Sequence, residues 1–326
     1  MLTPEQLRTF KREGAVILPA LVSNAQLANW RDQAWEAIAA AHGQTVERED
    51  PSTWPGGVFP NVPRELQPKP PLGELPQVRA LMGFLADGAF SGGGHMLKAV
   101  FPSSPGQLGT MEKFRLAGSA SDEPQKGDSG SFTGLGTAAV RAHAAANEGK
   151  ATPSSLPNGD HMDGSGHHRV AITLYLTDVH TDGGCFMYWK GGHRRIHQFW
   201  LDHPQHVGEM MPGKESFHST PPFQERGWTA IQDLGGTVVP LGTQFVARAG
   251  DALLWHGWNP HSSSVNLRGQ PRLALVARWN DAVPLRTAEG KQTFHVPALP
   301  EALFEHWGAG VRDSDGSLPA KGAARL

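Results

Sequence analysis

The 326-residue sequence has a single cysteine and almost no net charge, and each shortage excludes a class of protein. The lone Cys185 excludes an intramolecular disulfide framework and a cysteine-based zinc site. Its isolation is typical of a protein from a reducing compartment. The 29 basic and 31 acidic side chains leave a formal charge of -2, and this balance gives no support for a nucleic-acid partner.

Long apolar runs are missing as well. No segment approaches the roughly 18 apolar residues of a membrane span, and the opening residues, MLTPEQLRTFKREG, contain no apolar core of a signal peptide. We therefore expect a cytoplasmic protein without a membrane partner. The last residues, Ala324-Arg325-Leu326, loosely resemble a peroxisomal address, which would matter only in a eukaryote.

The first hundred residues carry the start and stop signals of helices. Thr3 is followed by proline and then by glutamine at the third helical position, which predicts a capped helix that ends at Gly14. Ser23 precedes a second run with apolar residues at helical spacing. A third helix is expected over 75–87, before a strand over 95–102. We expect these helices to brace the outside of a sheet.

From residue 160 onward the pattern changes to strands. The 39 glycines and 26 prolines suit many turns between short strands. In 169–179 one alternating set of residues (Val170, Ile172, Leu174, Leu176) is apolar, and the other is more polar and suits a cavity. Further strands are expected over 15–19, 184–189, 243–250, 251–257 and 272–280. The pattern predicts an α+β, mainly β fold: a double-stranded β-helix (jelly roll, cupin-like) with N-terminal helices bracing one sheet.

A candidate metal site begins at His161-Met162-Asp163. In an extended backbone His161 and Asp163 lie on the same side, because side chains alternate across a strand. Imidazole and carboxylate from one short segment make two-thirds of the 2-His-1-carboxylate facial triad that holds non-haem Fe(II). A third histidine must come from elsewhere in the chain.

That histidine is expected about a hundred residues further on, in GDALLWHGWNPHSSSVNLRGQPR. Both His256 and His261 are candidates. His261 has the better context, in a turn at Asn259-Pro260 before three serines, and His256 then has a supporting or structural role. Arg272 opens an apolar strand, where a planar guanidinium would grip a carboxylate. Four tryptophans surround these segments and are expected mainly in core packing, with substrate walls as the alternative: Trp189, Trp255, Trp258 and Trp279.

The sequence resembles the phytanoyl-CoA dioxygenase (PhyH-like) family of Fe(II)/2-oxoglutarate oxygenases. The likeness rests on four segments in the family's order: LTPEQLRTFKREGAVILPALVSNAQLANWR, the HMD triplet, YLTDVHTDGGCFMYWKGGHRR and the distal segment quoted above. It implies that His161, Asp163 and His261 are catalytic iron ligands and that Arg272 binds the C5 carboxylate of 2-oxoglutarate. Many relatives carry tryptophan near the position of Thr173, from which a cosubstrate contact is expected.

The resemblance implies hydroxylation of an unactivated C–H bond in a small-molecule substrate. Fe(II) would be the cofactor, 2-oxoglutarate and O2 would be consumed, and succinate and CO2 would be released. Desaturation, epimerisation or cyclisation at the same iron site is the alternative among enzymes. A non-catalytic jelly-roll binding protein is the alternative outside them. A zinc hydrolase fits less well, because the sequence has no H-E-x-x-H motif.

One domain is expected over 1–326. It comprises N-terminal helices and first strands (1–102), a long insertion (103–158), the metal-binding core (159–282) and a C-terminal tail (283–326). Residues 103–158 could form a lid over the metal or could be disordered, and the sequence leaves both interpretations open.

Overall fold

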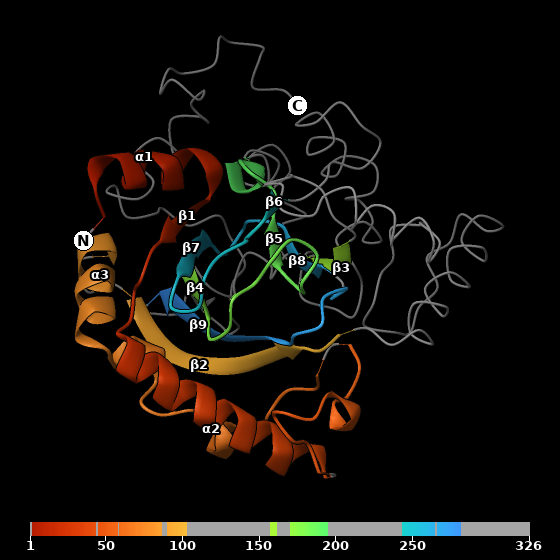
Figure 1. Cartoon of the computed structure of the whole chain (residues 1–326). Coiled ribbons are helices and arrows are strands. Elements are labelled where there is room, and N and C mark those ends of the chain that lie inside the picture. Colours follow the sequence, from red (N-terminus) through yellow and green to blue (C-terminus); the bar gives the residue numbers. More distant parts are fainter. Residues whose placement is uncertain are drawn as a thin grey trace, which may run out of the picture.

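The computed structural model describes residues 2–43, 45–57, 59–86, 90–102, 157–161, 170–194, 243–264 and 266–281. Most of the predicted insertion and the C-terminal tail lie outside these residues. Within them, two antiparallel sheets pack together, and helices cover the outer face of the larger sheet (Figure 1). The described part is therefore a mixed α/β structure with its helices on one side.

The N-terminal helices form where their caps predict them. In α1 (Pro4–Glu13) the Thr3 hydroxyl accepts the Gln6 N–H at 3.1 Å, and the Gln6 side chain accepts the Thr3 N–H at 2.9 Å. The helix ends at Gly14 in a left-handed conformation. The remaining helical elements are α2 (Asn24–His42), α3 (Pro76–Ala86) and the short 3-10 turns η1 (Pro51–Thr53), η2 (Arg64–Leu66) and η3 (Leu72–Glu74). No helix of the described part is both long and apolar enough to cross a membrane.

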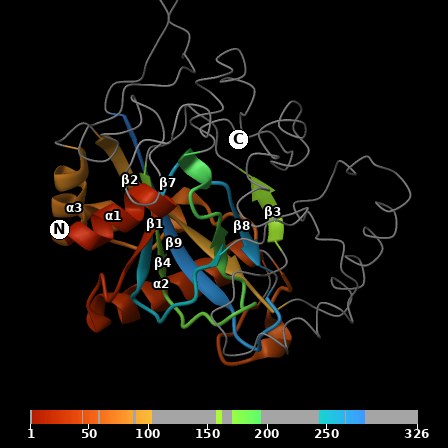
Figure 2. The ribbon, with the colours of Figure 1, turned by 90° about the horizontal axis from the view of Figure 1, so that it is seen from above.

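The larger sheet has the strand order β1-β7-β4-β9-β2, and the smaller sheet has the order β3-β8-β5-β6. The strands are β1 (Ala15–Leu18), β2 (Phe90–Val100), β3 (Pro157–His161), β4 (Val170–Tyr175), β5 (Phe186–Tyr188), β6 (Thr243–Gln244), β7 (Ala252–His256), β8 (His261–Ser264) and β9 (Arg272–Asp281). In Figure 1, α2 runs below β2 while β5, β8 and β3 lie on the other side of the larger sheet, and Figure 2 shows the same layers from above.

The alternation predicted for β4 is confirmed. Val170, Ile172 and Leu174 belong to the core between the larger sheet and the helices, together with Trp30 of α2. The alternate residues Ala171 and Tyr175 belong to a second cluster with Phe186 of β5 and Trp255 of β7, which fills the space between the two sheets. Because β4 is buried on both faces, its side chains enter the two clusters alternately. The candidate site lies on the side of the second cluster, which we call the inner cluster.

Three strand predictions need correction. The strand expected over 243–250 is only β6, two residues long. The strand expected over 95–102 begins earlier, at Phe90, so the glycines at 92–94 lie inside β2, which bulges between Gly92 and His95 where it pairs with β9. His261 is the first residue of β8 and not part of a turn. Serine is a weak strand former, but pairing with β3 and β5 on both sides outweighs that preference.

Candidate functional site

His261 is held in the interior with one ring nitrogen already committed. Its side chain is 4% exposed, and Nδ1 lies 3.0 Å from the carbonyl oxygen of Asn259. A carbonyl only accepts hydrogen bonds, so Nδ1 carries the ring proton in this contact and the lone pair lies on Nε2. A backbone carbonyl that fixes the tautomer in this way is the usual support of a metal-binding histidine.

His161 lies directly opposite His261 where β3 pairs with β8. The register shifts on the way: Asn158 opposes Ser263, so β3 uses three residue steps where β8 uses two. This bulge brings His161 rather than Asp160 opposite His261. Bulges of this kind re-aim residues and are common next to active sites. For His161 the structure describes the backbone alone, and Asp163 lies outside the described residues.

His256 occupies a different environment. Its Nδ1 accepts the backbone N–H of Trp258 at 3.0 Å, and its ring packs 6.4 Å from Phe10 of α1 and 5.2 Å from the Trp258 indole (centroid distances). Those neighbours belong to the core on the helix side, whereas His261 packs on Phe186 and Trp255 of the inner cluster. The structural role predicted for His256 is consistent with this position.

Arg272 is a buried guanidinium bound to uncharged oxygens. It is 5% exposed, and Nε donates to the carbonyl of Gly184 at 2.8 Å. Nη2 donates to the Ser263 hydroxyl at 3.3 Å, and Nη1 to the Lys98 carbonyl at 3.5 Å. Burial lowers the pKa of Arg272. No carboxylate forms an ion pair with it within the described residues, so this buried charge has the properties of a binding site for an anion.

Thr173 points into the inner cluster but meets a protein donor there. Its hydroxyl, on β4, accepts the indole N–H of Trp255 at 3.0 Å, and both side chains are at most 1% exposed. The Thr173 hydroxyl, from which a cosubstrate contact is expected, thus already accepts one hydrogen bond from the protein.

Sequence reasoning missed several neighbours of the predicted site. Ser263 lies two residues beyond His261 and meets Arg272. Tyr188 of β5 is the other cross-strand partner of His261, and burial raises the pKa of its phenol. Trp255 is among the four tryptophans expected near the site, but its contacts with Thr173 and His261 are not predicted by the sequence. Strand alternation indicates that Ser263 lies on the same face of β8 as His261, but the sequence does not indicate that β5 pairs with this strand or that a β7 side chain packs on it.

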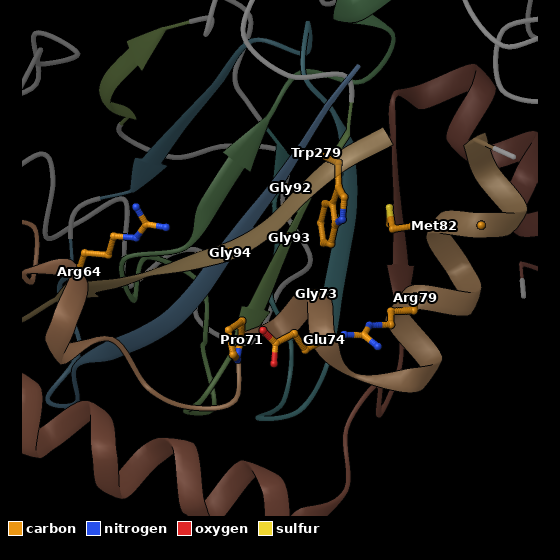
Figure 3. Close-up of a pocket in the computed structure, with 11 residues that line it drawn as sticks. Arg64, Pro71, Gly73, Glu74, Arg79, Met82, Gly92, Gly93, Gly94 and Trp279 are labelled. Carbon is orange, nitrogen blue, oxygen red and sulfur yellow. The ribbon is translucent and has the colours of Figure 1, made fainter. Parts of the chain in front are cut away.

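A separate pocket of about 600 Å³ lies outside the inner cluster. Its wall is formed by η3, α3, the glycine bulge of β2 and Trp279, and Figure 3 shows the Trp279 indole beside the glycine run. Trp279 belongs to the core on the helix side. Neither His261 nor Arg272 lines this pocket.

The amino-acid sequence matches no protein-family model and no curated protein. The structure of HygX from Streptomyces hygroscopicus with nickel and 2-oxoglutarate bound is similar, with a TM-score of 0.50 and 13% identity over 91% of this chain and 96% of that chain. The carbocyclase SnoK from nogalamycin biosynthesis (TM-score 0.46, 15% identity, 92% and 95% covered) and EvdO2 from Micromonospora carbonacea var. aurantiaca complexed with 2-oxoglutarate (0.44, 16%, 89% and 95%) also resemble it. The likeness to HygX shows a shared fold.

Proposed function

We propose that the chain is an Fe(II)/2-oxoglutarate-dependent dioxygenase, resembling the PhyH-like family, that hydroxylates an unactivated C–H bond of a small molecule. The observation that carries this proposal is the alignment along β8. His261 stands opposite His161, and two residues further on Ser263 meets the Arg272 guanidinium. Thus β8 brings two candidate metal ligands close to a buried group that could bind an anion.

The donor set fits iron. We assign His161, Asp163 and His261 as the ligands, because two imidazoles and one carboxylate are the facial triad of non-haem Fe(II) oxygenases. The tautomer of His261, with its proton on Nδ1, leaves the nitrogen lone pair that a metal needs on Nε2. Iron, 2-oxoglutarate and O2 would together supply the oxidising chemistry, with succinate and CO2 as co-products.

Arg272 is assigned to the far carboxylate of 2-oxoglutarate. Two residue steps along a strand cover about 7 Å, which is comparable with the length of a five-carbon dicarboxylate. A cosubstrate bound at the metal through one end could therefore reach the guanidinium with the other. The charge-assisted pair would replace the weak contacts of Arg272 with neutral oxygens, and the fork geometry suits a carboxylate.

The chain's remaining contribution is orientation and the exclusion of water. We infer that the two antiparallel sheets are the halves of a jelly roll whose interior holds the cosubstrate, as the shared fold with HygX supports. The inner cluster is formed by residues at most 8% exposed, so groups at the metal would react in a largely dry space.

The test is anaerobic addition of Fe(II) and then 2-oxoglutarate to the protein, followed by visible absorption spectroscopy. We expect the weak charge-transfer band of the chelate, its loss in Asp163→Ala, and its weakening in Arg272→Gln. Retention of zinc, or of no metal, without any band would overturn the proposal. Product analysis after succinate release then separates hydroxylation from desaturation, epimerisation and cyclisation.

A further inference from the structure

The side chains of Thr173, Trp255 and His261 form a chain of contacts that joins the two sheets. Thr173 and Trp255 come from neighbouring strands of the larger sheet, β4 and β7, while His261 is on β8 of the smaller sheet. The Thr173 hydroxyl accepts the Trp255 indole N–H at 3.0 Å. The Trp255 ring lies 4.5 Å from the His261 ring, measured between centroids, at an angle of 50°.

The imidazole of His261 is fixed by this contact and two others. Phe186 stacks on it with a centroid distance of 5.5 Å and an interplanar angle of 23°. Phe186 also packs 5.0 Å from Trp255, so the three rings form one group. The Asn259 carbonyl fixes the position of Nδ1. The hydrogen bond and the two aromatic neighbours together leave the ring little freedom to turn.

The Trp255 indole in this group is tied to the neighbouring strand β4 by its hydrogen bond to the Thr173 hydroxyl. Without the Thr173 hydroxyl the Trp255 ring would keep its apolar packing but lose this hydrogen bond, which helps to set its rotation. The bond is buried at both ends, and hydrogen bonds of this kind are costly to break by removing one partner. A change at Thr173 would therefore reach His261 through Trp255.

We propose that Thr173 and Trp255 are positioning residues for the metal ligand His261, and that the Thr173 hydroxyl acts through the indole and not by touching the cosubstrate. The inference rests on the proposed function. It assigns to a hydroxyl on β4 an effect on metal affinity, transmitted across the gap between the sheets. Supporting groups behind a metal ligand commonly change metal affinity about 10- to 100-fold when removed.

The test uses Co(II) as the probe, because its visible ligand-field absorption reports the geometry of its ligands. Anaerobic titration of the full chain gives a dissociation constant and a spectrum for each variant. In Thr173→Val and in Trp255→Phe we expect the Co(II) dissociation constant to rise about 10-fold and the ligand-field bands to shift. Thr173→Ser keeps the hydroxyl and should show the same Co(II) spectrum as the wild-type protein.

Two further variants separate positioning from general loss of stability. Trp258→Phe alters an equally buried tryptophan that packs on His256 instead of His261, and it should leave the Co(II) spectrum unchanged. In the double variant Thr173→Val/Trp255→Phe the dissociation constant should be no higher than in Trp255→Phe alone, since both changes break the same hydrogen bond. Thermal unfolding confirms that each variant is folded at the temperature of the titration.

The outcomes distinguish this inference from the proposed function. A wild-type protein that binds no Co(II) would overturn the proposed function. A wild-type protein that binds Co(II), with Thr173→Val indistinguishable from it, would overturn the positioning role alone. If Thr173→Val weakens 2-oxoglutarate binding while Co(II) affinity and spectrum are unchanged, the hydroxyl contacts the cosubstrate directly and the inference is also wrong.

Discussion

The Arg272 guanidinium reaches from β9 in the larger sheet to the Ser263 hydroxyl on β8 in the smaller one, with Nη2 and Oγ 3.3 Å apart. The contact crosses the interior between the sheets at a point two residues from His261. It holds a buried positive charge close to the candidate metal ligand His261. One carboxylate of a small diacid could bind at the metal while the other binds the Arg272 guanidinium.

Replacing Arg272 separates cosubstrate binding from metal binding. In Arg272→Lys the charge is kept but the fork that donates to Gly184 and Ser263 is lost. We expect the 2-oxoglutarate dissociation constant to rise about 10- to 100-fold, because hydrogen bonds to charged groups contribute about 1.5–3 kcal/mol. Isothermal titration of the metal-loaded protein measures this. An unchanged affinity would show that another group binds the distal carboxylate.

The two histidines of the distal segment form a matched pair. We expect His261→Ala to abolish Fe(II) binding and His256→Ala to preserve it, because only His261 faces the inner cluster opposite β3. His256→Ala should instead lower the melting temperature, since it empties space beside Phe10 and Trp258. Equilibrium dialysis well below both melting temperatures measures binding. Loss of iron in His256→Ala alone would reverse the assignment.

We expect His95 to make the stability of the protein depend on pH. Its Nδ1 accepts the Leu72 N–H at 2.9 Å, and Nε2 lies 2.9 Å from the Pro68 carbonyl, so the buried ring is neutral. Burial lowers the pKa of His95 to about 4, whereas the unfolded chain titrates near pH 6.5. Between these values the unfolded state binds more protons, and the free energy of unfolding falls as the pH is lowered from about 6.5 to about 4.

Urea unfolding near neutral pH and at about pH 5 tests this. One pKa unit corresponds to about 1.4 kcal/mol, so His95 should account for a loss of about 2 kcal/mol at pH 5. In His95→Gln that part of the pH dependence should vanish, although the variant is less stable at neutral pH. Identical pH slopes for the two proteins would show that His95 is not the group responsible.

The glycine bulge of β2 offers a second matched pair. A Cβ on Gly93 would lie 2.9 Å from the Cα of Gly73 in η3 and 3.0 Å from Nε1 of Trp279, and Gly93 has a φ of +91°. Gly93→Ala should therefore lower the free energy of unfolding by about 2 kcal/mol. Gly94→Ala, on the same strand with no atom within 4 Å of its Cβ, should be close to neutral. Equal changes in the free energy of unfolding would show that η3 gives way to the added Cβ and that the positive φ of Gly93 costs little.

Local signals were sufficient for the helices and for the two faces of β4. The cap at Thr3 and the stop at Gly14 act within one turn of helix, so neighbouring residues decide them. The alternation through Val170 and Ala171 was readable because strand geometry assigns successive residues to opposite faces. Arg272 was likewise found at the start of its strand.

The arrangement of the candidate site depended on contacts between distant segments. The register that sets His161 opposite His261 includes a bulge, and a shift of one residue would have placed Asp160 there instead. The proposed choice of His261 over His256 rests on the different cores that the two rings enter, with His256 beside Phe10 of α1 and His261 beside Trp255 and Phe186. The contact from Thr173 through Trp255 to His261 joins strands whose adjacency no local pattern encodes. The sequence by itself thus determined the residue types, the caps and the facing of single strands. Only the tertiary structure decided which of these residues meet, because strand pairing and register are set by the burial of the whole core.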